Sequence, residues 1–311
     1  MTTTQLAPLP TSNGPEPAAV TVRGLSKRYG GRPVLDGLDL EVQRGECFAL
    51  LGPNGAGKTT TIEILEGVRP RDAGDVDVLG EDPAVAGRRW RDRVGVVSQG
   101  EGAGPALSVR ETLDHFAGYH GSVRPTDGLL AAVGLTESAA VRVERLSGGQ
   151  RRRLAVALGV QGRPELLFLD EPTTGMDPVA RRQFWELIRG LRADGTTILL
   201  TTHYLDEAAE LADRVGVISG GRLVDVAPPD ELGAELRRES TVSWLEAGVR
   251  RRVSTETPAA VLRDLLAAHA EVPDLTVNRP GLEDVYLRLV GATPASTATP
   301  AGTAAPVGDL R

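Results

Sequence analysis

Eight consecutive residues early in the chain have a composition suited to phosphate binding. Glycines recur in this run before a lysine and a threonine, in the order Gly52-Pro53-Asn54-Gly55-Ala56-Gly57-Lys58-Thr59. Because glycine has no Cβ atom, successive backbone N–H groups can converge on phosphate oxygens. An apolar run at 47–51 precedes the loop and a helical pattern at 60–66 follows it, so a positive helix end would add to the site. We expect Lys58 to reach the β- and γ-phosphates of a nucleotide, Thr59 to hold Mg²⁺ and Thr60 to lie beside them.

Two acidic residues end a second apolar run, which begins at Leu166. A buried strand of this kind would carry the carboxylates of Asp170 and Glu171 to one edge of a sheet, as a Walker B element does. We expect Asp170 to contact Mg²⁺ through water and Glu171 to polarise an attacking water as a general base. By themselves, the two residues would also fit solvated acids at the end of a strand.

A further glycine turn opens a helical pattern at 151–160, and its sequence is Leu146-Ser147-Gly148-Gly149-Gln150. Ser147 is suited to cap that helix, and a Ser-Gly-Gly turn at a helix N-terminus is another anion site. The pentapeptide alone would also fit an ordinary glycine-rich turn. The chain therefore has two anion-binding ends but only one phosphate loop.

These motifs resemble those of the nucleotide-binding domain of the ABC superfamily, and the resemblance covers residues 18–226. Tyr29 matches the aromatic residue that stacks on adenine, and Gln99 matches the Q-loop glutamine that senses Mg²⁺ and the membrane partner. Asp177 matches the D-loop aspartate, and His203 matches the switch histidine that contacts the γ-phosphate. Each of these residues alone could be an ordinary turn, surface or core residue, but their joint order supports the resemblance.

The resemblance implies that ATP and Mg²⁺ are the cofactors. The residues that it implies for catalysis are Glu171, His203 and Lys58. Those that it places near the metal are Thr59, Gln99 and Asp170. It also implies a head-to-tail homodimer, in which each ATP lies between the phosphate loop of one subunit and the signature 147–150 of the other. Gln99 and the helical region would face a separate membrane permease, at the cytoplasmic face of the cell membrane.

The elements that would position these residues form an α/β pattern, with helices between apolar runs and a largely parallel sheet. The runs are 20–25, 47–51, 94–97, 166–170, 197–201 and 214–218. Short strands and turn signals over 18–46 predict an antiparallel layer, and about 102–162 reads as a mostly helical subdomain. The predicted fold is thus a P-loop (RecA-like) nucleotide-binding domain with an antiparallel β layer and a helical signature subdomain.

A small α/β domain is expected at 227–290, after the boundary signal Pro228-Pro229. Its expected helices are 231–238, 259–269 and 282–290, and its expected strands are 241–245, 249–254 and 275–278. The Ala-, Thr-, Pro- and Gly-rich ends, 1–17 and 291–311, are expected to be flexible tails.

Composition excludes several other classes of protein. The 311 residues carry a net charge of −7, and no basic-aromatic alternation is present, so no nucleic acid is expected as a partner. The start of the chain lacks the pattern of a secretory signal, and no apolar stretch approaches a membrane span. The single cysteine, Cys47, is expected to be a buried core residue. The arginine runs, 151–153 among them, are expected to be solvated or ion-paired faces.

The end of the second module narrows the subfamily. Residues 279–289, Arg-Pro-Gly-Leu-Glu-Asp-Val-Tyr-Leu-Arg-Leu, resemble a C-terminal segment of drug-export ATPases of the daunorubicin/doxorubicin resistance type. Gly281 and Tyr286 depart from that pattern, and the segment would equally suit an amphipathic helix packed on its own domain. The leading interpretation is an exporter ATPase for a drug, an antibiotic or a lipid-like compound.

Two other interpretations remain. A non-membrane ABC ATPase of translation or DNA repair would normally have two such domains, long coiled coils or zinc-binding cysteines, and none of these is found in the sequence. A P-loop GTPase or kinase would leave residues 146–150 unexplained, and the guanine motif Asn-Lys-x-Asp is absent.

Overall fold

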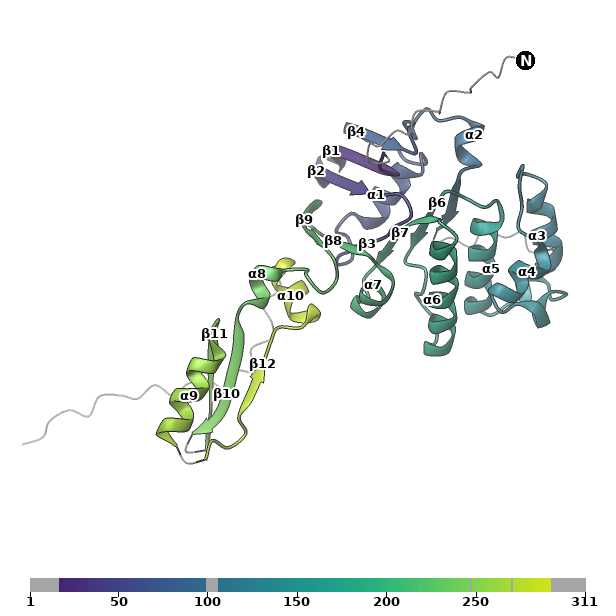
Figure 1. Cartoon of the computed structure of the whole chain (residues 1–311). Coiled ribbons are helices and arrows are strands. Elements are labelled where there is room, and N and C mark those ends of the chain that lie inside the picture. The colour runs from purple at the N-terminus through teal and green to yellow at the C-terminus, as the bar shows by residue number, and fades with distance from the viewer. Residues whose placement is uncertain (1–16, 99–105, 247, 270, 292–311) are drawn as a thin grey trace, which may run out of the picture. The chain divides into compact units, whose positions relative to one another are not determined.

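The computed structural model describes residues 17–98, 106–246, 248–269 and 271–291 (Figure 1). The chain divides after Pro229 into two compact units, each of which is described by itself. Gln99 and almost all of the expected tails lie outside the described residues.

A six-stranded sheet forms the centre of the first unit, with the strand order β5-β6-β7-β3-β8-β9. Its strands are β3 (Cys47–Leu51), β5 (Val94–Val97), β6 (Leu166–Asp170), β7 (Thr197–Thr202), β8 (Arg214–Ser219) and β9 (Arg222–Ala227). All neighbours pair in parallel except β9, which returns antiparallel to β8. The five parallel strands lie where the apolar runs predict them. The edge strand β9 was not expected from the sequence, because its residues are half-exposed and lack an apolar run.

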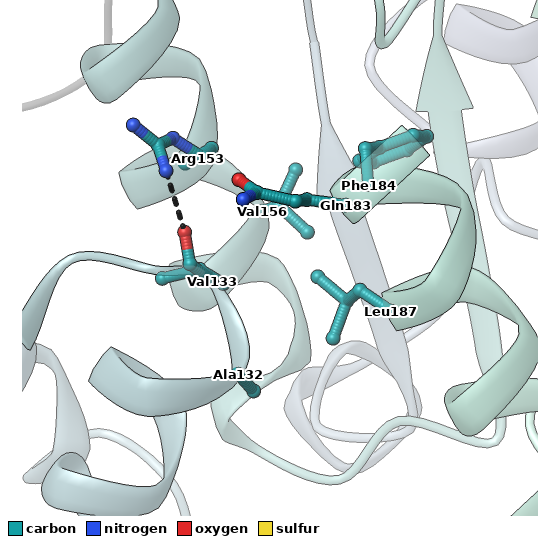
Figure 2. Close-up of a pocket in the computed structure, with 7 residues that line it drawn as sticks. All are labelled: Ala132, Val133, Arg153, Val156, Gln183, Phe184 and Leu187. Atoms are coloured by element: carbon teal, nitrogen blue, oxygen red, sulfur yellow. Dashed lines mark hydrogen bonds between the residues drawn. The ribbon is translucent and has the colours of Figure 1, made fainter. Parts of the chain in front are cut away.

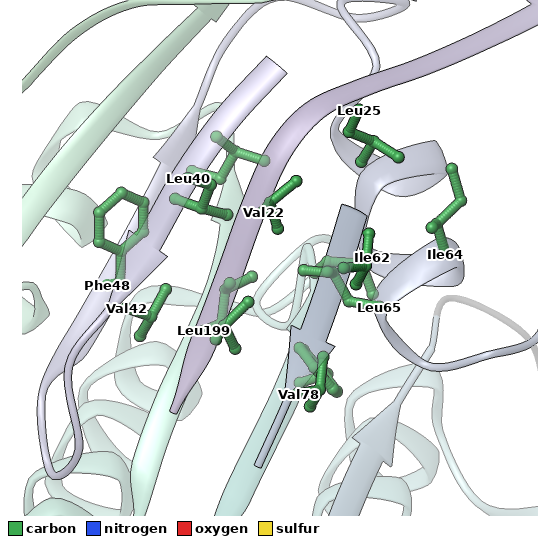
Figure 3. Packing of buried hydrophobic residues seen from close by; sticks show 14 of the residues in the cluster. Val22, Leu25, Leu40, Val42, Phe48, Ile62, Ile64, Leu65, Val78 and Leu199 are labelled. Carbon is green, nitrogen blue, oxygen red and sulfur yellow. The ribbon is translucent and has the colours of Figure 1, made fainter. Parts of the chain in front are cut away.

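A three-stranded antiparallel sheet, with the order β2-β1-β4, forms a second layer of this unit. Its strands are β1 (Val20–Tyr29), β2 (Arg32–Val42) and β4 (Ala73–Val78). The expected antiparallel layer is confirmed for β1 and β2, which form a hairpin at Gly30-Gly31, while β4 comes from beyond the predicted range. One apolar cluster joins this layer to the central sheet and to helix α1 (Lys58–Leu65), and Figure 3 shows Val22, Phe48, Ile62 and Leu199 within it.

Seven helices belong to the described part of the first unit. Besides α1 they are α2 (Arg88–Arg91), α3 (Val109–Ala117), α4 (Thr126–Ala132), α5 (Gly148–Gln161), α6 (Pro178–Ala193) and α7 (Leu205–Leu211). Two single 3₁₀ turns, η1 (Thr136–Ser138) and η2 (Val143–Arg145), connect α4 to α5. The region around α3 to α5 is helical, as expected. Figure 2 shows the small pocket where α4, α5 and α6 meet, lined by apolar side chains such as Val156 and Phe184.

The second unit is a small α/β module with the sheet order β11-β10-β12. Its elements are α8 (Ala234–Arg237), β10 (Ser240–Glu246), β11 (Val249–Thr255), α9 (Pro258–Ala268), β12 (Thr276–Asn278) and α10 (Leu282–Leu289). The first helix starts three residues later than expected, because Gly233 adopts a left-handed conformation (φ 61°) at its N-cap. Val285 of α10 is fully buried, and a Cβ atom at Gly233 would lie 2.2 Å from its Cγ1 atom. The drug-export-like segment therefore packs within its own module.

Among the helices of the described residues, none is both long and apolar enough to cross a membrane. Cys47 is completely buried in β3, and burial raises the pKa of its thiol to about 12. The thiol is thus a core group, as expected, and is inert at neutral pH.

Candidate active site

The phosphate loop connects β3 to α1, and two of its glycines are required by their surroundings. Gly57, the N-cap of α1, has φ 110°, and a Cβ atom there would lie 2.6 Å from Leu35. At Gly52, a Cβ atom would lie 2.5 Å from the carbonyl oxygen of Ile218. The loop therefore curls tightly over the end of β3, while Pro53, Asn54 and Gly55 remain exposed.

Lys58 lies beneath this loop with its side chain only 5% exposed. Its ammonium donates hydrogen bonds to the carbonyl oxygens of Gly52, at 2.8 Å, and Pro53, at 3.2 Å. The same group lies 3.4 Å from Glu171 Oε1. A positive charge and the proposed general base thus face each other across the site. The phosphate of a bound nucleotide would lie between the loop and this pair.

Asp170 ends β6 and has both of its carboxylate oxygens held by hydroxyl groups. Thr59 Oγ1 donates to Oδ2 at 3.0 Å, and Thr201 Oγ1 donates to Oδ1. Thr59 and Asp170 therefore offer adjacent hard oxygen ligands, which fit Mg²⁺ bound by one carboxylate, water and phosphate oxygens. No cluster of three or more His, Cys, Asp or Glu side chains suited to a metal occurs in the described part of the chain.

Glu171 follows Asp170 and has a strained backbone, with φ 47°, in the left-handed region that glycine favours. Its N–H donates to the carbonyl oxygen of Thr201, at 3.1 Å, and to the hydroxyl of the same residue, at 3.0 Å. Its carboxylate lies 3.3 Å from His203 Nδ1, although without the alignment of a hydrogen bond. The sheet order places β3 and β6 on the two sides of β7, so that the loop, Glu171 and His203 meet at the carboxyl ends of neighbouring strands.

The predicted signature lies at the start of α5. Ser147 Oγ accepts from the N–H of Gln150 at 3.2 Å, and Gln150 Oε1 accepts from the N–H of Ser147 at 2.9 Å, which forms a complete capping box. Gly148, which is exposed, and Gly149, which is half-buried, follow, and a Cβ atom on either would meet no described atom within 4 Å apart from its chain neighbours and its own helix.

Two other predicted residues have structural roles within the chain. Asp177 caps α6 by accepting from the N–H groups of Val179 and Ala180, both at 2.9 Å, and these bonds lower the pKa of its carboxyl. Tyr29 is 40% exposed at the end of β1, with its ring beside the cations of Lys27 and Arg69. Thr60 is half-buried in the first turn of α1.

Comparison with known proteins decides the family. A model described as ABC transporter matches residues 35–174. The Nod factor export ATP-binding protein I of Ralstonia nicotianae is 43% identical over 304 residues, covering 88% of this chain and 94% of that protein. The daunorubicin resistance ATP-binding protein DrrA3 of Streptomyces coeruleorubidus is 39% identical, over 88% and 96% of the two chains. The chain belongs to the ABC transporter family of ATP-binding proteins.

Solved structures agree with this assignment. The structure of an ATP-binding subunit of an ABC transporter aligns with a TM-score of 0.64 and 26% identity, over 70% of this chain and 92% of that one. A post-hydrolysis ATP-binding cassette dimer bound to ADP and Pi aligns with a TM-score of 0.62 at 22% identity, over 68% and 98% of the two chains. These structures confirm the predicted ABC fold, and membership of the ABC transporter family of ATP-binding proteins confirms the predicted ATP-hydrolysing activity.

The geometry of this ABC ATPase adds two residues that sequence reasoning missed. Thr201 is fully buried, and its hydroxyl connects Asp170 to the N–H of Glu171. The position of the Thr201 hydroxyl at the end of an apolar strand was the sequence signal that could have identified this residue. The second residue is Arg152, whose guanidinium bonds backbone carbonyl groups beside Asp170. The expectation that residues 151–153 form a solvated or ion-paired face is wrong for Arg152. Its side chain is partly buried, and its guanidinium donates to carbonyl groups near the ends of neighbouring strands.

Substitution of Thr201 by valine tests its bridging role. The change keeps the side-chain shape but removes the bonds to Asp170 and Glu171, so we expect kcat to fall by about 10- to 100-fold with little change in KM. The measurement is steady-state ATP hydrolysis. Thr197→Val is the matched control, since Thr197 lies at the other end of β7, where its hydroxyl accepts from the N–H of Gly45 at 3.0 Å. Equal losses for both variants would contradict the bridge.

Glu66, the C-cap of α1, generates a prediction on stability. Burial, and then the charges of Asp170 and Glu63, raise the pKa of its carboxyl from 4.5 to about 8. The folded chain thus retains a proton that the unfolded chain releases, so the free energy of unfolding decreases as pH rises from 4.5 to 8. Glu66→Gln removes this loss, and its advantage over the wild type should grow to about 2–4 kcal/mol at pH 8.

Urea unfolding without nucleotide at pH 5, 6.5 and 8 measures this difference. Glu186→Gln serves as the control, because Glu186 pairs with Arg189 at 2.7 Å and its charge does not act on the Glu66 carboxyl. A constant difference between Glu66→Gln and wild type across the three pH values would refute the assignment.

Proposed function

We propose that this ABC ATPase powers an exporter by hydrolysing Mg²⁺-bound ATP as a head-to-tail homodimer. It works with a separate membrane permease at the cytoplasmic face of the cell membrane. The observation that carries the enzymatic part is the convergence of Lys58, Glu171 and His203 on one loop, with Glu171 Oε1 3.4 Å from the Lys58 ammonium and 3.3 Å from His203 Nδ1.

The residues divide the work of hydrolysis. Lys58 and the loop N–H groups bind the β- and γ-phosphates, and His203 contacts the γ-phosphate. Glu171 accepts a proton from the attacking water, which forms the new P–O bond as the bond to ADP breaks. When bound, Mg²⁺ at Thr59 and Asp170 would neutralise charge on the phosphates. Tyr29 would stack on adenine, and Gln99 would report the state of the site to the permease.

The dimer is supported by the signature turn. Gly148 is exposed and Gly149 is half-buried, and a Cβ atom at either position would have space outside its own helix, so the described packing does not by itself require glycine there. A phosphate that approaches the N-terminus of α5 closely does require small residues and free N–H groups. In the proposed dimer, the phosphate at this turn belongs to the site of a second copy. Asp177 matches the D-loop aspartate of the family.

The direction of transport rests on relatives. One is named for Nod factor export and another for daunorubicin resistance, and both matches extend over 88% of this chain. A drug, an antibiotic or a lipid-like compound is therefore the proposed cargo. The names of these two relatives refer to export and drug resistance and not to translation or DNA repair, and nucleic acid is not a proposed partner.

Glu171→Gln tests the hydrolytic site. The amide keeps the shape but cannot accept the proton, so turnover should fall by about 10²- to 10⁴-fold while ATP still binds. Size-exclusion chromatography with ATP should then show a dimer. Glu165→Gln is the control, because Glu165 lies before the opposite end of β6 and pairs with Arg93 at 2.7 Å. Near-normal hydrolysis by Glu171→Gln would exclude it as the base.

Efflux measurements test the transport role. Cells that produce the chain together with a candidate membrane permease should accumulate less daunorubicin than cells with the same permease and the Lys58→Ala chain. The reason is that Lys58 is the cation expected to bind the phosphates. A Nod factor is the second probe. Equal accumulation of both compounds in the two strains, with ATP hydrolysis intact, would contradict export of these cargoes and leave the ATPase assignment standing.

A further inference from the structure

Arg152, in the second turn region of α5, directs one guanidinium at three backbone carbonyl groups. Nε donates to Pro172 O at 2.9 Å, Nη2 donates to Asp170 O at 2.6 Å, and Nη1 donates to Ser98 O. These acceptors lie 20, 18 and 54 residues away in the sequence. A single side chain thus ties the signature helix to the ends of β6 and β5.

The three carbonyl groups belong to residues next to Glu171 and Gln99. Asp170 and Pro172 are the residues on the two sides of Glu171, and Ser98 is the last described residue before Gln99. Glu171 is held at φ 47°, a conformation that its neighbours must enforce. Thr201 fixes the N–H of Glu171, while Arg152 fixes the carbonyl groups before and after it. The direction of the Glu171 carboxylate therefore depends on both.

Electrostatics agree with the geometry. Burial lowers the pKa of the Arg152 guanidinium, and the negative charges of Asp170, Glu207 and Glu171 act in the opposite direction. The guanidinium remains charged and is surrounded by the acidic groups of the site. A planar fork of this kind can bond several oxygens in fixed directions, which an amine cannot reproduce.

The neighbouring arginines provide an internal comparison. Arg151 Nη1 donates to Leu146 O at 2.8 Å, within the signature turn itself. Arg153 Nη1 donates to Gly134 O at 3.1 Å and Val133 O at 3.4 Å, beside the pocket in Figure 2. Arg153 therefore also anchors α5 through carbonyl groups, but to the helical region and away from β6.

We propose that Arg152 is a positioning residue for hydrolysis. It aims Glu171 and locks the signature helix to the end of β6, so that the carboxylate of one ATP site and the signature offered to the other site move together. The coupling of the two sites rests on the dimer proposed above. The orientation of the Glu171 carboxylate does not rest on the dimer, because it depends only on contacts within one subunit.

Arg152→Gln tests this in the full chain. The amide cannot span three carbonyl groups, so the backbone around Glu171 should shift, and small misplacements of a catalytic group are costly. We expect kcat to fall by about 30- to 100-fold, with KM and the Kd for ATP within about threefold of wild type. Arg152→Lys keeps the charge but reaches fewer carbonyl groups, so its kcat should be about tenfold below wild type.

Arg153→Gln is the matched control, and its kcat should stay within about threefold of wild type. Equal losses in the Arg152 and Arg153 variants, or a parallel loss of ATP binding, would show a general effect on α5 and overturn the proposal. If Arg152→Gln does not fold, Arg152→Lys decides, because wild-type kcat in that variant would reduce the role of Arg152 to its charge.

ATP-dependent dimerisation of Glu171→Gln, measured with and without Arg152→Gln, separates the two proposals. If neither protein forms a dimer with ATP, the proposed homodimer is contradicted. The kcat of Arg152→Gln would still test whether Arg152 orients Glu171.

Discussion

The burial of Lys58 is the constraint on which the rest of the structure depends. An ammonium that is 5% exposed must be compensated, and here two loop carbonyl oxygens and the Glu171 carboxylate do so. These acceptors come from two strands that are not neighbours, since β7 lies between β3 and β6. Only a parallel order that brings these carboxyl ends to one edge can place them around one cation. The same cation is the group that a phosphate needs.

The apolar core follows from that constraint. A loop with several exposed residues has little packing of its own, so α1 must be held from below by the cluster that Figure 3 shows between the two sheets. Ile62 and Leu65 of α1 are almost fully buried in it. Fixing α1 fixes the direction of its N-terminus and therefore of the loop N–H groups. Binding geometry is thus determined by packing on the side of the helix that never meets the nucleotide.

Sequence reasoning recovered the parts of this protein that are local. The five parallel strands, the phosphate loop and the acids at the end of β6 each have a continuous pattern that fixes type and place. It missed contacts between distant segments. Arg152 stands in a run of three arginines that look alike, and only the fold shows that its acceptors, 18 to 54 residues away, surround Glu171. The strand β9 was missed because an edge strand needs no apolar run.

The signature turn is the feature behind the proposal that each site is shared between two subunits. Lys58 faces Glu171, and Asp170 accepts from Thr59 and Thr201 inside the unit, whereas Gly148 is exposed and Gly149 is half-buried at the start of α5. The capping box of Ser147 and Gln150 uses the side chains of the turn for its own helix and still leaves the helix end exposed. A rigid, exposed, positively polarised helix end is suited to bind an anion from outside the subunit. Because α5 is also bonded through Arg152 to the strand that carries Glu171, an anion bound at its tip acts on a helix that is continuous with the catalytic machinery of its own subunit.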